Sequence, residues 1–167
     1  MKLRSPAGYI NGQRECAVSR HRLGLRKAAS NGCAAIAVYN AMLYAGYSPD
    51  YATISLGIEV YALRMGGLLG THPEKMENYF KNMRIPAIKA ADYSDFKRVL
   101  DAVNVGIVCY WVAKPKKSLL HFVAITNNKN GTYSVYNRYS NRKKPSVINS
   151  IDKLCTEDRF VNGFFLN

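Results

Sequence analysis

Residues 30–46 read Ser-Asn-Gly-Cys-Ala-Ala-Ile-Ala-Val-Tyr-Asn-Ala-Met-Leu-Tyr-Ala-Gly, a segment with helix signals at both ends. Ser30 or Asn31 can cap the first backbone N–H groups, and Gly46 supplies the left-handed residue with which many helices end. Apolar side chains fall on nearly every face of the helix between them, which is typical of a helix packed on several sides. We therefore expect a central, buried helix.

Cys33 falls in the first turn of this helix. Unpaired backbone N–H groups and the positive end of the helix dipole stabilise an anion there, so the position favours the thiolate, the nucleophilic form of cysteine. Taken alone, a cysteine in an apolar helix is more often a small buried side chain. A role as nucleophile therefore depends on suitable partners elsewhere in the chain.

Length and composition indicate a single domain over 1–167. A chain of 167 residues buries about 70% of the surface that it exposes when unfolded. The four cysteines are widely scattered and form no C-x-x-C pair, which argues against a disulfide or zinc framework. We find no secretory signal and no apolar run of about 20 residues. We therefore expect reduced thiols, a cytoplasmic protein and no membrane span.

The formal net charge is +13, and the basic residues are unevenly distributed. Residues 1–27 contain seven Lys and Arg against one acid, whereas residues 28–63 contain none against two. Residues 1–29 lack a sustained apolar period, which predicts a basic, partly irregular N-terminal arm. Basic clusters at 114–117 and 138–144 flank a predicted hairpin. Each alone is typical of a solvated loop, but together they would attract acidic peptides, phosphate-bearing ligands or nucleic acid.

Helix signals dominate the first part of the chain and strand signals the second. Further helices are expected to begin near Pro49, Pro73 and Ser94, where turn and capping residues precede apolar positions at helical spacing. This order indicates an α+β domain in which an N-terminal helical layer packs on a C-terminal antiparallel sheet. Short β-branched and aromatic runs predict its strands at 106–111, 119–126, 132–136 and 159–166.

The second and third of these strands form a hairpin that carries two polar residues. If the turn is centred on Lys129, His121 lies directly opposite Asn137 on one face, with Cβ atoms about 5 Å apart. A two-residue turn at 130–131 would instead place Asn137 opposite Ala124 and remove the pairing. The first register aligns the apolar residues of the two strands, and we therefore favour it.

Cys33, His121 and Asn137 together supply the three groups that thiol catalysis needs. A nucleophilic thiol needs a base to take its proton, and the base needs a third group that fixes its tautomer. One imidazole nitrogen would pair with Cys33, and the other would donate to the side-chain oxygen of Asn137. We therefore predict a Cys-His-Asn triad.

These residues resemble the site of papain-like cysteine peptidases, and the chain is similar to the bacteriocin-processing branch that cleaves after a double glycine. In that superfamily the cysteine opens the central helix, the histidine follows on a strand, and an Asn or Asp lies on the next strand. The resemblance implies a bacterial thiol protease with a papain-like fold. The matching segments are Asn31-Gly32-Cys33-Ala34-Ala35, Leu120-His121-Phe122-Val123 and Tyr136-Asn137.

One feature of that superfamily has no direct match. A glutamine several residues before the cysteine usually completes the oxyanion hole with the cysteine N–H, but residues 23–30 contain no glutamine. Asn31 is the nearest amide and the first candidate. Gln13 is a distant one, because its use requires the N-terminal arm to fold back. Loss of one oxyanion donor lowers the rate about 100-fold or more.

Three functions fit these observations. The first is hydrolysis of a peptide or amide bond through an acyl-enzyme on Cys33, with no metal or organic cofactor. The second is transfer of the same acyl group to an amine or thiol acceptor. The third is a noncatalytic basic module that binds an acidic or nucleic-acid partner, although no recognisable nucleic-acid motif accompanies the basic clusters.

Overall fold

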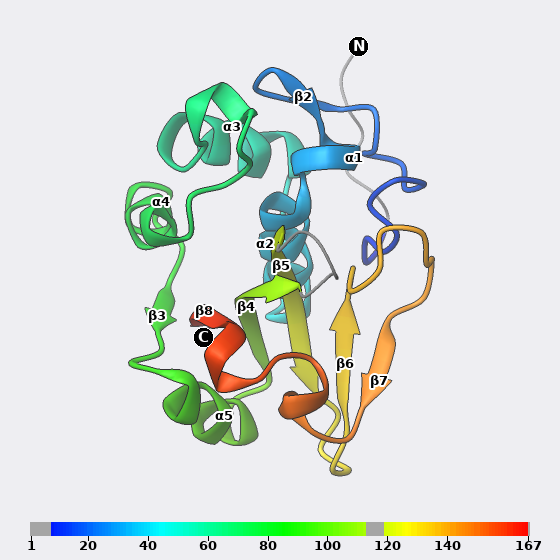
Figure 1. Cartoon of the computed structure of the whole chain (residues 1–167), viewed down its shortest axis with the longest axis vertical. Coiled ribbons are helices and arrows are strands. Elements are labelled where there is room, and N and C mark those ends of the chain that lie inside the picture. Colours follow the sequence, from blue (N-terminus) through cyan, green and yellow to red (C-terminus); the bar gives the residue numbers. More distant parts are fainter. Residues whose placement is uncertain (1–7, 113–118, 167) are drawn as a thin grey trace.

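The computed structural model describes residues 8–112 and 119–166, so the basic cluster at 114–117 lies outside the described residues. A six-stranded antiparallel sheet forms the centre of the molecule (Figure 1). The predicted strands are confirmed, and the short strands β3 and β7 extend the sheet at its two edges. In spatial order the strands are β3 (Ala87–Lys89), β8 (Phe160–Leu166), β4 (Val105–Val112), β5 (Leu119–Asn127), β6 (Tyr133–Tyr136) and β7 (Ser146–Ile148).

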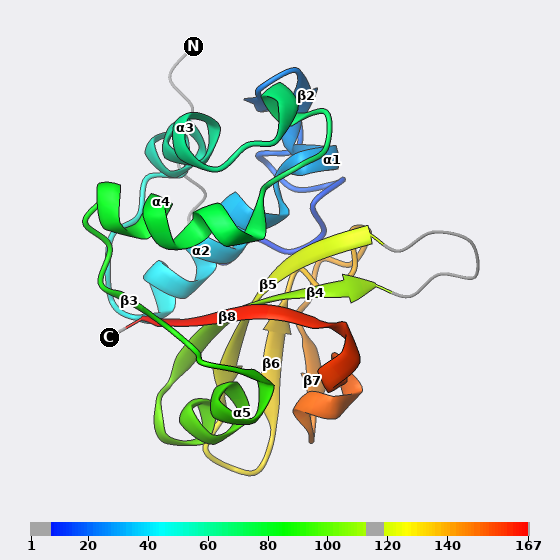
Figure 2. The ribbon, with the colours of Figure 1, turned by 60° about the vertical axis from the view of Figure 1, so that its left-hand side comes forward.

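Helices cover both faces of this sheet (Figure 2). The helices α2 to α4 lie on one face, whereas α5 lies on the other. The α+β class is therefore confirmed, but the helices do not form a single layer as expected. The α-helices are α1 (Ala28–Asn31), α2 (Cys33–Tyr44), α3 (Tyr51–Tyr61), α4 (Met76–Asn82) and α5 (Tyr93–Ala102), and the 3-10 helices are η1 (Met65–Gly67), η2 (Pro73–Lys75), η3 (Ile151–Lys153) and η4 (Glu157–Arg159).

The central helix α2 is as deeply buried as the sequence indicates. All residues from Ala34 to Ala41 are buried, and Gly46 adopts a φ of 88° just beyond the end of the helix. The predicted side-chain cap is absent, because Gly32 is the N-cap residue of α2 and no side chain caps its N–H groups. The short helix α1 precedes it and turns Ser30 and Asn31 away from the capping position.

Strand alternation divides the core between the two faces of the sheet. Phe122 and Ala124 of β5 pack with the residues of α2, whereas Val123 and Ile125 pack with those of α5. Because successive side chains of a strand point to opposite faces, each central strand contributes to both clusters. This arrangement explains why the central strands are mostly apolar on both faces rather than alternately polar.

The β5–β6 hairpin adopts a register that differs from both predicted ones. Ala124 pairs with Tyr136, two residues away from the alignment that we favoured. A shift of two residues leaves every side chain on its original face. His121 therefore becomes a diagonal rather than a direct neighbour of Asn137, which is still within reach of a long side chain.

Contacts of Asn127 outside the hairpin account for this register. Its backbone N–H donates to the carbonyl of Asn104 (3.0 Å), and its amide donates to the carbonyls of Leu100 and Asp101 (3.2 Å each) at the end of α5. Its side-chain oxygen accepts from the N–H of Lys129 (2.8 Å) and starts the turn. A tertiary contact with α5 therefore keeps Asn127 in the strand, where local sequence does not place it.

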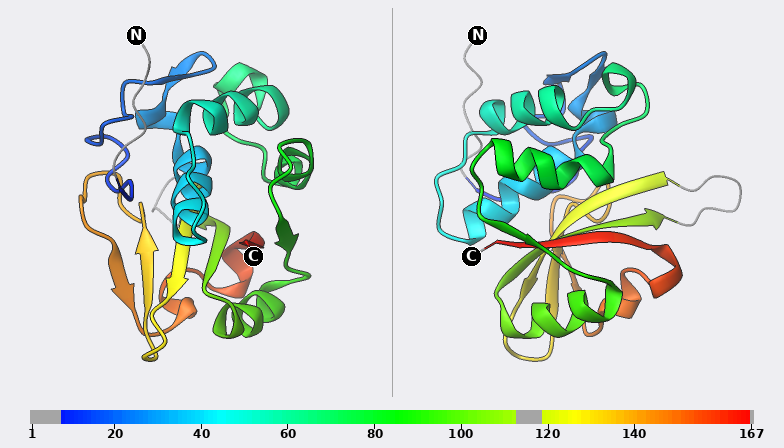
Figure 3. Two further views of the ribbon diagram at one scale, coloured as in Figure 1. Left: turned by 180° about the vertical axis from the view of Figure 1, so that it is seen from behind. Right: turned by 90° about the vertical axis from the view of Figure 1, so that its left-hand side faces the viewer.

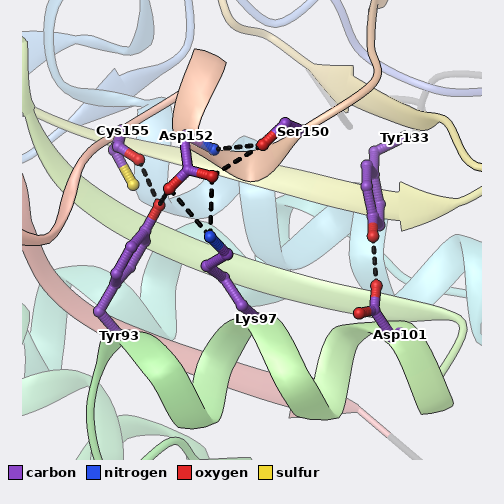
Figure 4. A network of polar contacts seen from close by, with 7 residues as sticks. All are labelled: Tyr93, Lys97, Asp101, Tyr133, Ser150, Asp152 and Cys155. Carbon is purple, nitrogen blue, oxygen red and sulfur yellow. Dashed lines mark hydrogen bonds and ion pairs between the residues drawn. The ribbon is translucent and has the colours of Figure 1, made fainter.

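A polar network fastens α5 to the C-terminal segment (Figure 4). Lys97 Nζ pairs with Asp152 Oδ2 at 2.8 Å, and the single hydroxyl hydrogen of Tyr93 is shared between Asp152 Oδ1 and the carbonyl of Cys155, each 2.7 Å from the hydroxyl oxygen. Ser150 donates its hydroxyl to the same carboxylate. These bonds lower the pKa of Asp152, so the network holds its charge well into the acidic range.

The N-terminal arm folds back between α2 and the segment that follows β6 (Figure 3). Asn40, in the middle of α2, accepts from the N–H of Ile10 (2.7 Å) and donates to its carbonyl (2.8 Å). Gly12 adopts a φ of 69° and approaches the backbone of Arg142 so closely that a Cβ there would lie 2.9 Å from the Arg142 carbonyl oxygen. The arm is therefore held by specific contacts on both sides.

We expect Asn40→Ala to lower the free energy of unfolding by about 2 kcal/mol, because it leaves two buried backbone groups of Ile10 without partners. Urea unfolding measures this change. Asn82→Ala is the matched control, since Asn82 is also an amide on a helix but makes its hydrogen bond at the surface. Equal effects of the two substitutions would contradict the anchoring role of Asn40.

Within the described part of the chain, none of the helices has the length and apolar character needed to cross a membrane.

Candidate active site

A cavity of about 470 Å³ lies beside the first turn of α2, where the helix meets β5. Cys33 and His121 both line it, so the structure brings these two predicted residues to one site. Gln13 from the N-terminal arm lines the same cavity, together with the basic residues Arg14 and Arg138. The folded arm therefore forms one wall of the site.

Cys33 is the first residue of α2 and is half-buried. Burial raises the pKa of its thiol above the ordinary value of 9.0, and this effect outweighs the backbone N–H groups of Phe122, Ala34 and Cys33 that act in the opposite direction. Burial therefore opposes the thiolate that the helix dipole alone predicts and favours the protonated thiol, whereas these N–H groups would stabilise the anion once it forms.

His121 is held in one tautomer by the chain that follows β6. Its Nε2 lies 2.7 Å from the backbone carbonyl oxygen of Asn137. Because a carbonyl can only accept, Nε2 carries the proton, and in the neutral ring Nδ1 is then an acceptor. Burial lowers the pKa of His121, so the ring is neutral at pH 7. A neutral imidazole with an acceptor nitrogen is the form required of a general base.

Asn137 supports the site through its backbone and not through the expected contact of its side chain with His121. Its side chain faces Gln13 instead: Oδ1 accepts from the Gln13 N–H (3.0 Å), and Nδ2 donates to Gln13 Oε1 (3.2 Å). Its own N–H donates to Oδ1 of Asn11 (2.9 Å). A φ of 60° at Asn137 turns the chain out of β6, a conformation that asparagine tolerates better than most residues.

Gln13 is fixed in orientation by these bonds. Its side-chain oxygen accepts from Asn137, which leaves the amide NH₂ group as a donor on a residue that lines the cavity. The side chain is buried, with 5% of its surface exposed, and its backbone is tied to Asn137 as well. These bonds hold the Gln13 side chain in one orientation in the wall of the cavity that Cys33 and His121 also line.

Asn31, the nearest amide in sequence, is committed elsewhere. Its Nδ2 donates to the carbonyl of Gly67, so the side chain secures the loop that follows α3. It lines a different cavity, which contains Cys33 but not His121. The donor that we expected from Asn31 is therefore engaged in holding the loop.

That second cavity has a volume of about 430 Å³. The exposed side chains of Leu68, Leu69 and Trp111 line it, together with Arg26 and Arg64. It shares part of its wall with the first cavity, because both are lined by Arg26, Ser30, Cys33, Leu119 and Leu120. We call the cavity that contains His121 the basic compartment, after its three arginines, and the second one the apolar compartment, after its exposed leucines and tryptophan.

The sequence alone did not show whether the N-terminal arm folds back, and it therefore did not place Gln13. Asn40 carries the signal that points to it, because a polar residue in the middle of an otherwise apolar helix needs a buried partner. The sequence does not show that this partner is the backbone of Ile10. The role of the Asn137 carbonyl has no sequence signal, since every residue has a carbonyl.

The architecture is similar to that of a solved peptidase domain. The structure superposes on the peptidase domain of Streptococcus ComA, a bi-functional ABC transporter involved in quorum sensing, with a TM-score of 0.57 and 11% sequence identity. The alignment covers 86% of this chain and 95% of the ComA domain. No protein-family model matches the sequence, and no curated protein matches it either. The chain therefore has an α+β fold similar to that of this peptidase domain.

Proposed function

We propose that this protein is a cysteine peptidase or amidase that cleaves through an acyl-enzyme on Cys33. The observation that carries the proposal is the tautomer of His121: its Nε2–H is fixed by the Asn137 carbonyl, and the ring lines the cavity that also contains the Cys33 thiol. Nδ1 is then the nitrogen that takes the thiol proton. The similarity of the fold to a peptidase domain supports the same class of reaction.

The reaction begins with a neutral pair. As the Cys33 sulfur forms its bond to the carbonyl carbon of the substrate, its proton passes to Nδ1 of His121. The imidazolium then protonates the leaving amine as the C–N bond breaks, which leaves a thioester on Cys33. A water molecule that gives its proton to His121 hydrolyses the thioester and restores the thiol.

The oxyanion of the tetrahedral intermediate needs donors that are in place before it forms. The backbone N–H of Cys33 is one, since the first N–H groups of a helix have no partner within the helix. We assign the second to the amide NH₂ of Gln13 in place of Asn31, because the Asn31 amide holds Gly67 whereas Gln13 lines the cavity that contains Cys33 and His121. The proposed chemistry draws on protein groups alone.

Cleavage of a proteome-derived peptide library in H₂¹⁸O tests this function. Hydrolysis through Cys33 yields new C-termini that carry ¹⁸O, and Cys33→Ala abolishes them. Cys16→Ala is the control, since Cys16 is also half-buried but belongs to the arm, beside the carbonyl of Gln13. Products joined to an added amine would indicate acyl transfer instead. Cleavage that persists in Cys33→Ala, or its absence from the wild-type protein, would contradict the proposal.

Asn137→Gly is expected to lower kcat/KM by about tenfold to 100-fold, because it removes both side-chain bonds to Gln13. Glycine accepts the positive φ and keeps the backbone carbonyl that holds His121. The pH below which the activity falls should therefore stay the same. A double-mutant cycle checks this: adding Asn137→Gly to Gln13→Ala should lower the rate little further. A change in that pH, or a double variant whose loss of activity is the sum of the two single losses, would indicate that the Asn137 side chain acts on His121.

A further inference from the structure

We propose that the site selects peptides with acidic residues directly after the cleaved bond, which rests on the function proposed above. Two compartments meet at Cys33: the basic one is lined by Arg14, Arg26 and Arg138, and the apolar one by exposed leucines and Trp111 together with Arg26 and Arg64. The chemistry of the reaction determines which compartment receives which part of the peptide.

The leaving group must occupy the compartment that contains His121. His121 has to protonate the amine that departs, so that amine and the residues attached to it lie on the His121 side of the sulfur. His121 lines the basic cavity, whereas the apolar cavity contains Cys33 without it. The acyl part of the substrate therefore lies in the apolar cavity, and the residues after the cleaved bond lie over the basic one.

The basic compartment extends away from the site into a second basic cavity of about 550 Å³. Arg138 and Tyr139 line both cavities and make them neighbours. Beyond them, Arg142, Lys143 and Lys144 line the outer one. A peptide that leaves the site on this side therefore passes several cations in succession.

These cations are not neutralised by carboxylates. None of the described residues that line the two cavities is acidic, and the ion pairs seen in residues 8–112 and 119–166 involve other lysines and arginines. Arginine and lysine side chains in a groove without counter-charges raise the local concentration of anions. Carboxylates of a peptide are the anions that a peptide-cleaving site would meet.

A peptide fits this surface better than a nucleic acid does. Single-stranded nucleic acids bind through aromatic rings on which their bases stack. Tyr139 is the aromatic residue at the junction, and its ring is in contact with the guanidinium groups of Arg138 (5.2 Å) and Arg142 (4.7 Å). The ring thus supports the two arginines, which suits them to bind carboxylates.

Sequencing the products from the peptide library tests this selection. Asp and Glu are expected to be enriched about fivefold in the first positions after the cleaved bond relative to the positions before it, and the enrichment should fall as salt is raised. Lys143→Gln/Lys144→Gln removes two exposed cations of the groove and should abolish most of the enrichment. Lys75→Gln/Lys81→Gln removes the same charge from an exposed surface away from the cavities and should retain it.

Binding provides a second readout that does not need turnover. Cys33→Ala protein is titrated with a fluorescent decapeptide rich in Glu and with its Gln counterpart, at low and high salt. Tighter binding of the Glu peptide, lost in the Lys143→Gln/Lys144→Gln background, supports the acidic specificity. Equal binding of both peptides, or displacement of the Glu peptide by far lower concentrations of poly-uridine RNA, overturns it.

The two proposals fail in different ways. Cleavage that depends on Cys33 but shows no enrichment of Asp and Glu overturns the acidic specificity and leaves the peptidase function intact. Selective binding of the Glu peptide without any cleavage supports the acidic site and overturns the peptidase function.

Discussion

Replacing His121 with alanine is expected to lower kcat/KM for peptide cleavage by about 10⁴-fold. Burial raises the pKa of the Cys33 thiol, so the reaction needs a base, and none of the other described residues that line the cavity can take the proton at neutral pH. Initial rates with a peptide found in the library experiment measure the effect. His72→Gln is the control, because His72 precedes η2 and lines neither cavity beside Cys33.

The pH dependence of kcat/KM of the wild-type protein also tests whether His121 acts as the base for Cys33. The active form has a neutral His121 and a protonated Cys33. Burial lowers the pKa of His121 below 6.5, so activity should fall only when the pH drops below that value. Burial raises the pKa of Cys33 above 9.0, so activity should fall again only above that value. These two pH limits are properties of the coupled Cys33–His121 pair and not of either residue alone. Rapid alkylation of Cys33 by iodoacetamide at pH 5–6 would instead show a resting ion pair and contradict this account.

Gln13→Ala is expected to lower kcat/KM by about 10² to 10³-fold through loss of one oxyanion donor. Gln13→Glu sharpens the test, because it keeps an oxygen that can accept from Nδ2 of Asn137 and replaces the NH₂ donor with a carboxylate oxygen, whose negative charge also repels the oxyanion. Both variants should lose activity while thermal unfolding shows that they remain folded. Full activity of Gln13→Glu would contradict the assignment.

The rate of alkylation of Cys33 distinguishes the loss of an oxyanion donor from a change in the reactivity of the thiol itself. Reaction of Cys33 with iodoacetamide forms no oxyanion, so its rate in Gln13→Ala should stay within about threefold of that of the wild-type protein. A parallel loss of alkylation and cleavage would show that Gln13 acts by holding the structure around Cys33.

The elements that follow from local periodicity could be predicted from the sequence. The helix that begins at Cys33, the strand that carries His121 and the order of helices and strands all follow from apolar spacing and turn residues. The hairpin register could not be predicted, because Asn127 is held in β5 by the end of α5. The contact between β5 and α5, which are distant in sequence, therefore sets the register of the hairpin.

The sequence predicted that Cys33 and His121 lie at one site, whereas the residues that support them were harder to predict. Cys33 and His121 line one cavity as expected. Burial raises the pKa of Cys33 and so acts against the thiolate that the helix dipole was expected to favour. Gln13 approaches them through the contacts of Asn40 with Ile10, and no local pattern encodes that fold-back.

Covalent labelling with a peptidyl vinyl sulfone tests the pairing of Cys33 with His121 most directly. Digestion and mass spectrometry of the labelled protein identify the modified cysteine, and Cys16 serves as an internal control for simple accessibility. The account predicts an adduct on Cys33 alone, formed at least about 100-fold more slowly in His121→Ala. Labelling of Cys16 as fast as Cys33, or an equal rate at Cys33 in His121→Ala, would contradict it.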